Sequence, residues 1–145
     1  MKAVIQRVRK TTLKVDGKLI SEIPFGLAVY LGVKCGDTEE QADAVAKKVS
    51  KLRIFEDSNG KMNLSVADVG GEILLISQFT LYGDCSHGNR PSFTEAERPE
   101  PANRLYGYTA EKLRETGITV KTGVFGADMK IEQFNDGPVT IIFEI

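Results

Sequence analysis

The stretch SQFTLYGD, residues 77–84, places polar side chains where an apolar run ends. Residues 73–76 before it are all leucine or isoleucine, and a long loop rich in proline and glycine follows it. Side chains alternate along a strand, so Gln78 and Thr80 can face one side while Ser77 faces the other. Polar groups at the end of a buried strand, beside a long loop, are typical of ligand sites in α/β folds. The alternative is a strand that simply runs out into solvent.

The only other compact cluster of reactive side chains is Asp84, Cys85 and His87. A zinc site needs three or four protein ligands at characteristic spacings, and the chain holds a single histidine, so we expect no metal site. A Cys85–His87 nucleophilic pair stays open, because residues two apart on an extended segment share one side, although no third group orients the base. No phosphate-binding glycine motif occurs, which argues against nucleotide hydrolysis and dinucleotide redox chemistry and predicts no cofactor.

Near the C-terminus, Gly137 and Pro138 stand directly ahead of a run of strand-forming residues, VTIIFEI. Proline donates no N–H to a sheet and glycine adds no side chain to pack, so both are poor strand residues. Asn135, Asp136 and Gly137 tolerate positive φ, and the segment therefore predicts a hairpin turn with Pro138 as the first residue of an edge strand.

The first half of the chain predicts a hairpin, a buried strand and a helix. The strands are expected at 2–8, 11–15, 19–23 and 26–33, with an Asp-Gly turn between the second and third. The helix begins at Asp37 or Thr38, because either residue can cap it. Its apolar residues recur on one face, namely Ala42, Val45, Ala46, Val49 and Leu52. This face predicts packing against a sheet.

The second half predicts a central strand, a long loop and a second helix. A polar turn at 56–63 precedes the strand at 72–81, which is apolar enough to be buried on both faces. The loop at 82–103 has no periodicity, and long loops in compact domains are usually functional. The helix runs from about 102 to 116 with Gly117 as its C-cap. Strands near 118–122, 128–134 and 138–144 close the chain.

Together these elements predict a single-domain α/β fold over residues 1–145, with mixed β-sheet layers and helices on one side. The expected order is β2-(βα)2-β3: two hairpin strands, two strand–helix units and three closing strands. A chain of 145 residues with 41% hydrophobic and 27% charged residues is an ordinary globular domain. Topology beyond this order does not follow from pattern.

Charge and hydropathy restrict the partners. The net charge of −1 lacks the basic excess of a nucleic-acid binder, although residues 1–18 hold six Lys or Arg against Asp16, so a polyanion would dock locally. The longest apolar stretch, 23–33, is shorter than the ~20 residues of a membrane span, so we expect no membrane association. Residues 1–10 lack the pattern of a secretory signal, which indicates the cytoplasm, and Cys35 and Cys85 are expected to be free thiols.

Several motifs together resemble one family. SQFTLYGD at 77–84 and NDGPVT at 135–140 are similar to the paired signature of the D-aminoacyl-tRNA deacylases. Four further segments resemble the same family in the same order, and the resemblance covers essentially the whole chain: QRV at 6–8, GKMNLSV at 60–66, GNRPSF at 88–93 and TGVFGADM at 122–129. The sequence departs from the family pattern at Gly83, where alanine is common, and at His87, where a basic residue is more frequent. The second departure leaves open whether this position contacts RNA.

The resemblance implies a homodimeric hydrolase that cleaves the ester between a D-amino acid and the 3′-terminal adenosine of tRNA. In the family, the Gly-Pro bond is cis and enters the active site of the other subunit, so Gly137 and Pro138 would bind substrate across the interface. Main-chain carbonyls there would exclude the side chain of an L-amino acid. Glycine has no side chain to exclude, so glycyl-tRNA, including glycine mischarged on tRNA-Ala, would also be a substrate.

The resemblance also suggests the catalytic residues. Thr80 would position the ester or attack it, and we favour positioning because no adjacent base is visible in the sequence. The main-chain N–H groups of Phe79 and Thr80 would stabilise the oxyanion, with Ser77 and Gln78 in support. Three further residues, Met129, Phe125 and Arg7, would bind substrate, the first two as pocket walls and Arg7 as a group that faces tRNA.

Three alternatives stay open at this point. One is a noncatalytic module that binds the acceptor end of tRNA, since no acid–base pair is visible in the sequence. A second is a small hydrolase that uses Cys85 as its nucleophile. The third is an editor of L-alanine mischarged on tRNA, an activity associated with the trans form of the same Gly-Pro motif.

Overall fold

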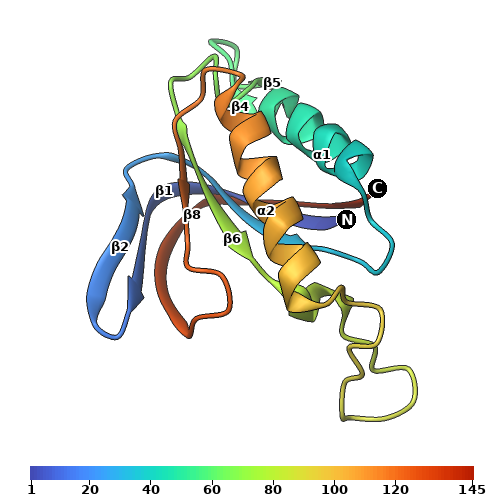
Figure 1. Ribbon diagram of the computed structural model, residues 1–145. Coiled ribbons are helices and arrows are strands. Elements are labelled where there is room, and N and C mark those ends of the chain that lie inside the picture. The colour runs from blue at the N-terminus through green and yellow to red at the C-terminus, as the bar shows by residue number, and fades with distance from the viewer.

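The computed structural model describes residues 1–145 and contains one six-stranded mixed sheet, a small two-stranded sheet and two helices (Figure 1). The elements are β1 Lys2–Val15, β2 Lys18–Ile23, β3 Gly26–Gly32, α1 Glu39–Lys51, β4 Phe55–Glu56, β5 Met62–Leu64, β6 Glu72–Ser77, the 3-10 turn η1 Phe79–Tyr82, α2 Pro99–Arg114, β7 Val120–Thr122 and β8 Met129–Glu144. This arrangement confirms the predicted single-domain mixed α/β class. No helix is long and apolar enough to cross a membrane.

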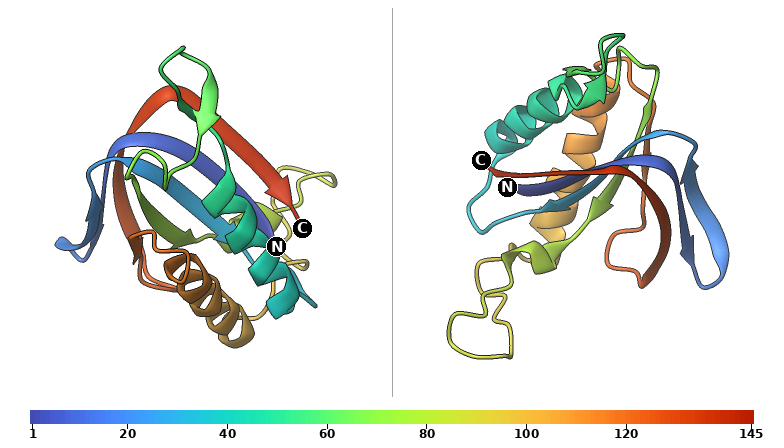
Figure 2. Two further views of the ribbon diagram at one scale, coloured as in Figure 1. Left: turned by 90° about the horizontal axis from the view of Figure 1, so that it is seen from above. Right: turned by 180° about the vertical axis from the view of Figure 1, so that it is seen from behind.

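The two longest strands, β1 and β8, pair antiparallel with each other from Lys2↔Glu144 to Val15↔Met129. The other edge of β1 is shared, because its first half pairs with β3 and its second half with β2. The sheet order is β2-β1-β3-β6-β7, with β8 added beside β1, and β3, β6 and β7 run parallel. Both long strands bend strongly in Figure 2, and their pairing shifts register around Val8. One edge of β8 pairs with nothing in this chain.

Two apolar clusters lie on opposite faces of the sheet. The larger contains 24 buried residues and includes the inner faces of both helices, whereas the smaller contains six buried residues from β1, β2, β3 and β6. Strand β6 contributes to both, because Ile73 and Leu75 belong to the larger cluster and Leu74 and Ile76 to the smaller one. This alternation confirms a central strand buried on both faces and explains why its sequence is continuously apolar.

The helices begin where local chemistry favours it. Thr38 caps α1 in a capping box with Gln41, as expected from sequence. Helix α2 begins at Pro99, three residues before the predicted start, because proline suits the first helical turn. The two helices run in the same direction, since Glu39 near the start of α1 bonds to Arg104 at 2.6 Å and Asp43, one turn later, bonds to Tyr108 at 3.1 Å.

Three strand predictions were wrong at their ends. The strands expected at 2–8 and 11–15 form one continuous strand, β1, because β8 pairs with it along its whole length. The strand expected at 72–81 ends at Ser77, because η1 turns the chain there. The hairpin turn expected at residues 135–137 does not form: the predicted strands 128–134 and 138–144 belong to one strand, β8. Both parts pair with β1 in the same direction, so the residues between them form an irregularity in the strand and do not reverse the chain. The chain therefore closes with two strands where three were expected.

Candidate active site

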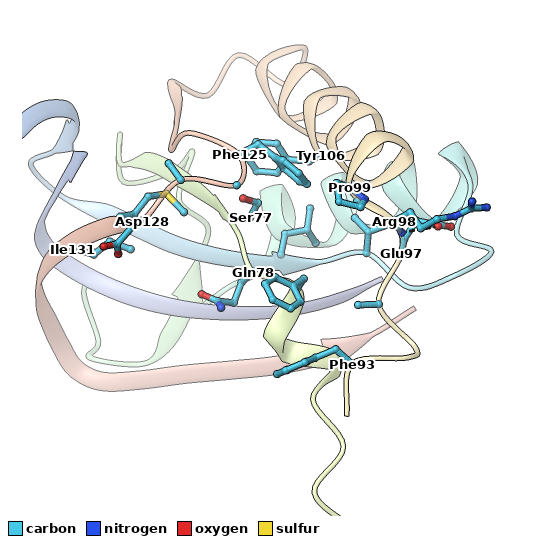
Figure 3. Close-up of a pocket in the computed structure, with 18 residues that line it drawn as sticks. Ser77, Gln78, Phe93, Glu97, Arg98, Pro99, Tyr106, Phe125, Asp128 and Ile131 are labelled. Atoms are coloured by element: carbon cyan, nitrogen blue, oxygen red, sulfur yellow. Dashed lines mark hydrogen bonds between the residues drawn. The ribbon is translucent and has the colours of Figure 1, made fainter. Parts of the chain in front are cut away.

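A cavity of about 590 Å³ lies between the end of β6, the start of α2 and the segment that leads into β8 (Figure 3). Its position at the carboxyl end of a parallel strand agrees with the site expected from sequence. Most of its wall is apolar, and a drug-sized or aminoacyl group fits such a volume. The cavity is therefore the first candidate for substrate binding.

Three of the four predicted catalytic residues line this cavity. Ser77, Gln78 and Phe79 belong to its wall, and Figure 3 shows the first two at the end of β6. Thr80 is not part of the wall, and its side chain is exposed. The Thr80 hydroxyl accepts a hydrogen bond from the Gln78 side-chain amide, so it can orient a group that does face the cavity.

The 3-10 turn after β6 presents main-chain donors beside the cavity. Its bonds run from the Leu81 N–H to the Gln78 carbonyl at 3.3 Å and from the Gly83 N–H to the Thr80 carbonyl at 3.0 Å. The N–H groups of Phe79 and Thr80 come first in the turn, so these turn bonds do not use them. Adjacent N–H groups that a turn leaves unused can stabilise a developing oxyanion.

Aromatic and sulfur-containing side chains form the apolar wall. Phe125 and Met129 both line the cavity, as the resemblance implied. Tyr106 stands beside Phe125, with ring centroids 6.0 Å apart, and its hydroxyl donates to the Leu75 carbonyl at 2.8 Å. Burial raises the pKa of Tyr106 to about 12, so this tyrosine is a neutral structural donor at physiological pH and no proton carrier.

A polar rim was not predicted from sequence. Glu97, Arg98 and Asp128 line the opening, the first two directly before α2. The Glu97 carboxylate accepts from the Arg98 N–H at 2.8 Å and from the Gly36 N–H at 3.3 Å. The signal that could have found the first two is their place at the end of the loop already considered functional; Asp128 lies in a motif that the resemblance had marked.

Three predicted substrate-binding residues lie outside the cavity. Gly137 and Pro138, joined by a cis peptide bond, are exposed and contribute nothing to its wall. Arg7 is only 6% exposed, so the expectation that it faces tRNA does not fit its position. Its guanidinium instead donates to the main-chain carbonyls of Asp136 at 3.2 Å and Ile54 at 2.8 Å, and it pairs with the Asp136 carboxylate at 3.2 Å. Arg7 therefore anchors the segment that leads into Gly137.

The Asp84–Cys85–His87 segment lies on an exposed arm apart from the cavity. Asp84 accepts from the Ser86 N–H at 2.8 Å and from the Ser86 hydroxyl at 3.0 Å, and these bonds lower the pKa of its carboxyl. No hydrogen bond joins Cys85 to His87. The arm is held by local turn bonds, and the nucleophilic pair considered from sequence is not assembled.

Comparison with known proteins gives the family. A family model described as D-Tyr-tRNA(Tyr) deacylase matches residues 4–144. The chain belongs to this family. Curated D-aminoacyl-tRNA deacylases from Geotalea daltonii and from Bacillus cereus strain G9842 are 56% and 52% identical to it over 144 residues. These matches cover 99% of this chain and 96% and 99% of the relatives, respectively.

Solved structures share the fold of this chain. A structure titled c-Myc DNA Unwinding Element Binding Protein superposes with a TM-score of 0.92 at 43% identity, covering 100% of this chain and 99% of that one. A probable eukaryotic D-amino acid tRNA deacylase has a TM-score of 0.86 at 18% identity and covers 99% of this chain and 98% of its own, which shows the shared fold. The shared fold thus extends over the whole chain, and the cavity lies where the family signature at residues 77–84 begins.

Proposed function

We propose that this deacylase-family enzyme hydrolyses the ester between a D-amino acid and the 3′-terminal adenosine of tRNA, releasing free tRNA and the D-amino acid in the cytoplasm. The observation that carries the proposal is that Ser77, Gln78 and Phe79 line an apolar cavity directly before a 3-10 turn whose own bonds leave the Phe79 and Thr80 N–H groups unused. The cavity takes the aminoacyl group, and the N–H pair takes the carbonyl oxygen. No cofactor is required, because the substrate is already an activated ester.

The reaction needs little from the protein beyond positioning. Water attacks the ester carbonyl carbon, the carbonyl oxygen becomes an oxyanion that accepts from the two N–H groups, and the C–O bond to the ribose 3′-oxygen then breaks. The proton lost by the water passes to the departing 3′-oxygen, and the neighbouring RNA 2′-hydroxyl is suited to relay it. Thr80 acts by orienting the Gln78 amide, since no base stands beside its hydroxyl to activate it.

The rejection of L-amino acids is assigned to Gly137 and Pro138 of a second subunit. Both are exposed and outside the cavity of their own chain, so they can act only on a substrate held elsewhere. Main-chain carbonyls read handedness at Cα and stay indifferent to side-chain identity, and an L side chain would collide with them. Glycyl-tRNA passes this filter, including glycine mischarged on tRNA-Ala.

The surface of β8 supports a homodimer. Phe134 and Ile142 on this strand are each 65% exposed, which is a high fraction for large apolar side chains, and the strand has one unpaired edge. A long edge strand with exposed apolar residues favours association with another chain. A second copy that covers this face would also bring Gly137 and Pro138 close to another molecule.

The test is to remove one oxyanion donor. Phe79→Pro deletes the N–H, and the position tolerates proline because it is the first residue of the turn and Gln78 before it, with φ −148° and ψ 83°, lies outside the helical region that a following proline disfavours. Loss of one such donor costs roughly 10²–10³-fold in kcat, measured on D-tyrosyl-tRNA. The matched control Phe79→Leu keeps the N–H and should stay within about tenfold of the unsubstituted protein. Equal kcat values for the two variants would contradict the proposed oxyanion site.

A noncatalytic tRNA-binding role is the second candidate, favoured by one observation. Glu97 and Asp128 are the only carboxylates that line the cavity, both belong to the rim, and no histidine lines it. If the protein binds D-tyrosyl-tRNA while the ester survives unchanged, the binding role replaces the enzyme. Full activity of Cys85→Ala is the expected result that excludes a cysteine nucleophile.

A further inference from the structure

The cations without ion pairs are concentrated in one region. The chain has 19 lysines and arginines, and eight of them take part in none of the salt bridges. Five of these eight lie between residues 47 and 61, and they form what we name the α1-end cluster: Lys47, Lys48, Lys51, Arg53 and Lys61. All five are exposed. A surface with this many uncompensated positive charges suits a polyanion.

The acidic residues of this region are already engaged. Asp57 accepts from the Asn59 and Lys61 N–H groups at 2.8 and 3.1 Å and closes the β4–β5 turn, and Glu56 faces Arg7 at 3.9 Å. Asp68 accepts from the Ser65 hydroxyl at 2.7 Å, and its bonds to Ser65, with a smaller effect of the Arg53 charge, lower the pKa of its carboxyl. These carboxylates do not pair with Lys47, Lys51 or Lys61, so the three lysines remain free to bind phosphates.

The α1-end cluster lies far from the cavity of its own chain. The cavity is at the start of α2, and the two helices run in the same direction from the Glu39–Arg104 bond. A helix of 13 residues is about 20 Å long, and the cluster begins near the far end of α1. In Figure 1 the β4–β5 hairpin is at the top, whereas the loop that leads into α2 is at the bottom.

The same cluster lies close to Gly137 and Pro138. The Arg7 guanidinium donates to two main-chain carbonyls, those of Ile54 and Asp136. Ile54 follows Arg53 of the cluster, and Asp136 precedes Gly137, so one side chain holds the two segments together. A second contact connects the cluster to β8 farther along, because the Lys48 ammonium lies 5.0 Å from the Phe143 ring centroid. The cluster therefore flanks the strand that carries the Gly-Pro segment.

We propose that the α1-end cluster binds phosphates of the tRNA acceptor stem whose aminoacyl end occupies the cavity of the partner subunit. The inference rests on the proposed function, in which Gly137 and Pro138 enter that partner cavity. An RNA 3′ end that meets this segment leaves its duplex beside residues 51–61, whereas the chain's own cavity lies about one helix length away from them. Each subunit thus supplies the chiral filter and part of the RNA-binding surface for the active site of its neighbour.

The test neutralises three exposed lysines whose side chains make no hydrogen bond or ion pair, Lys47→Gln, Lys51→Gln and Lys61→Gln together. On D-tyrosyl-tRNA we expect KM to rise by roughly tenfold or more at low salt, because about three phosphate contacts are lost. The negative slope of log(kcat/KM) against log[salt] should become shallower by about two to three. Hydrolysis of 3′-O-D-tyrosyl-adenosine, which has no acceptor stem, should not change. Unchanged KM and slope on the tRNA substrate would overturn the inference.

A control of equal charge removes Lys10, Lys14 and Lys18 by the same substitution to Gln, on the β1–β2 hairpin. If this control weakens tRNA use and the α1-end variant does not, the RNA contacts the N-terminal hairpin and the inference is wrong. Filter binding of uncharged tRNA separates the two proposals. Loss of tRNA binding in the α1-end variant supports the RNA-binding surface whether or not the protein hydrolyses the ester. If the unsubstituted protein hydrolyses no ester, that result refutes only the proposed deacylase activity.

Mixed dimers test the assignment to the partner. One subunit carries the α1-end substitutions with an intact cavity, and the other carries Phe79→Pro with an intact cluster. The one intact cavity of each mixed dimer then works with the intact cluster of the neighbouring subunit. We expect this cavity, half of all the cavities present, to show the KM of the unsubstituted protein. A KM that stays at the value of the α1-end variant would show that the cluster serves the cavity of its own subunit, which overturns the proposal that it binds tRNA for the partner's cavity.

Discussion

Replacing Arg7 with lysine tests how the Gly-Pro segment is held. The guanidinium donates from Nη1 to the Ile54 carbonyl and from Nε to the Asp136 carbonyl, at 2.8 and 3.2 Å. A lysine ammonium keeps the charge but has no planar fork to span both acceptors. One charge-assisted bond is lost and one buried carbonyl is left without this donor, at a cost of about 1.5–3 kcal/mol.

Thermal unfolding and stereospecific kinetics measure the effect. For a chain of this size we expect Tm to fall by about 4–10 °C. We also expect the ratio of kcat/KM for D-tyrosyl-tRNA over L-tyrosyl-tRNA to fall, because the loosened Gly137 segment no longer excludes the L side chain firmly. Arg9→Lys is the matched control: Arg9 is 70% exposed and pairs with the same Asp136 carboxylate at 3.1 Å, so its loss costs ~0–1 kcal/mol. Arg7→Lys with unchanged Tm and stereospecificity would refute this role.

Three further predictions follow from the site and the strand that flanks it. Burial raises the pKa of Tyr106 from 10.0 to about 12, so the stability that its neutral hydroxyl contributes is complete below pH 10 and is lost between pH 10 and 12. Tyr106→Phe should therefore flatten the decline of the free energy of unfolding over this alkaline range. An unchanged decline in the variant would contradict this prediction. Thr80→Val should lower kcat by only about tenfold, since it removes one hydrogen bond, whereas loss of a nucleophile would cost ~10⁴-fold or more. Phe134→Glu and Ile142→Glu together should convert a dimer to monomers in sedimentation and abolish deacylation; an active monomer would exclude the cross-subunit site.

Patterns with a strong local cause were predictable from sequence. Thr38 can cap a helix with Gln41 whatever the rest of the chain does, and the apolar face that follows has a 3.6-residue period. Strand β6 could be identified as buried on both faces because its apolar run is unbroken. Ser77 and Gln78 could be placed at a site for the same reason, since they are the first polar residues after that run.

Features that depend on distant contacts were not predictable. Residues 135–137 have the composition of a turn, yet pairing with β1 on both sides keeps them inside one strand. Arg7 is one of six cations near the N-terminus, and only the Ile54 and Asp136 carbonyls, 47 and 129 residues away along the chain, distinguish it from the exposed ones. Glu97 lies in the loop before α2 and Asp128 in the segment before β8, so their meeting at the cavity requires the fold.

The most direct test of the central claim is the survival of three esters with nanomolar protein: D-tyrosyl-tRNA, L-tyrosyl-tRNA and glycyl-tRNA. The chiral filter predicts that the D-tyrosyl and glycyl esters disappear while the L-tyrosyl ester decays at its uncatalysed rate. A variant with Ala at both Gly137 and Pro138 should lose activity or this discrimination. Equal decay of the D- and L-tyrosyl esters with the unsubstituted protein, or loss of L-alanyl-tRNA ahead of D-tyrosyl-tRNA, would contradict the account.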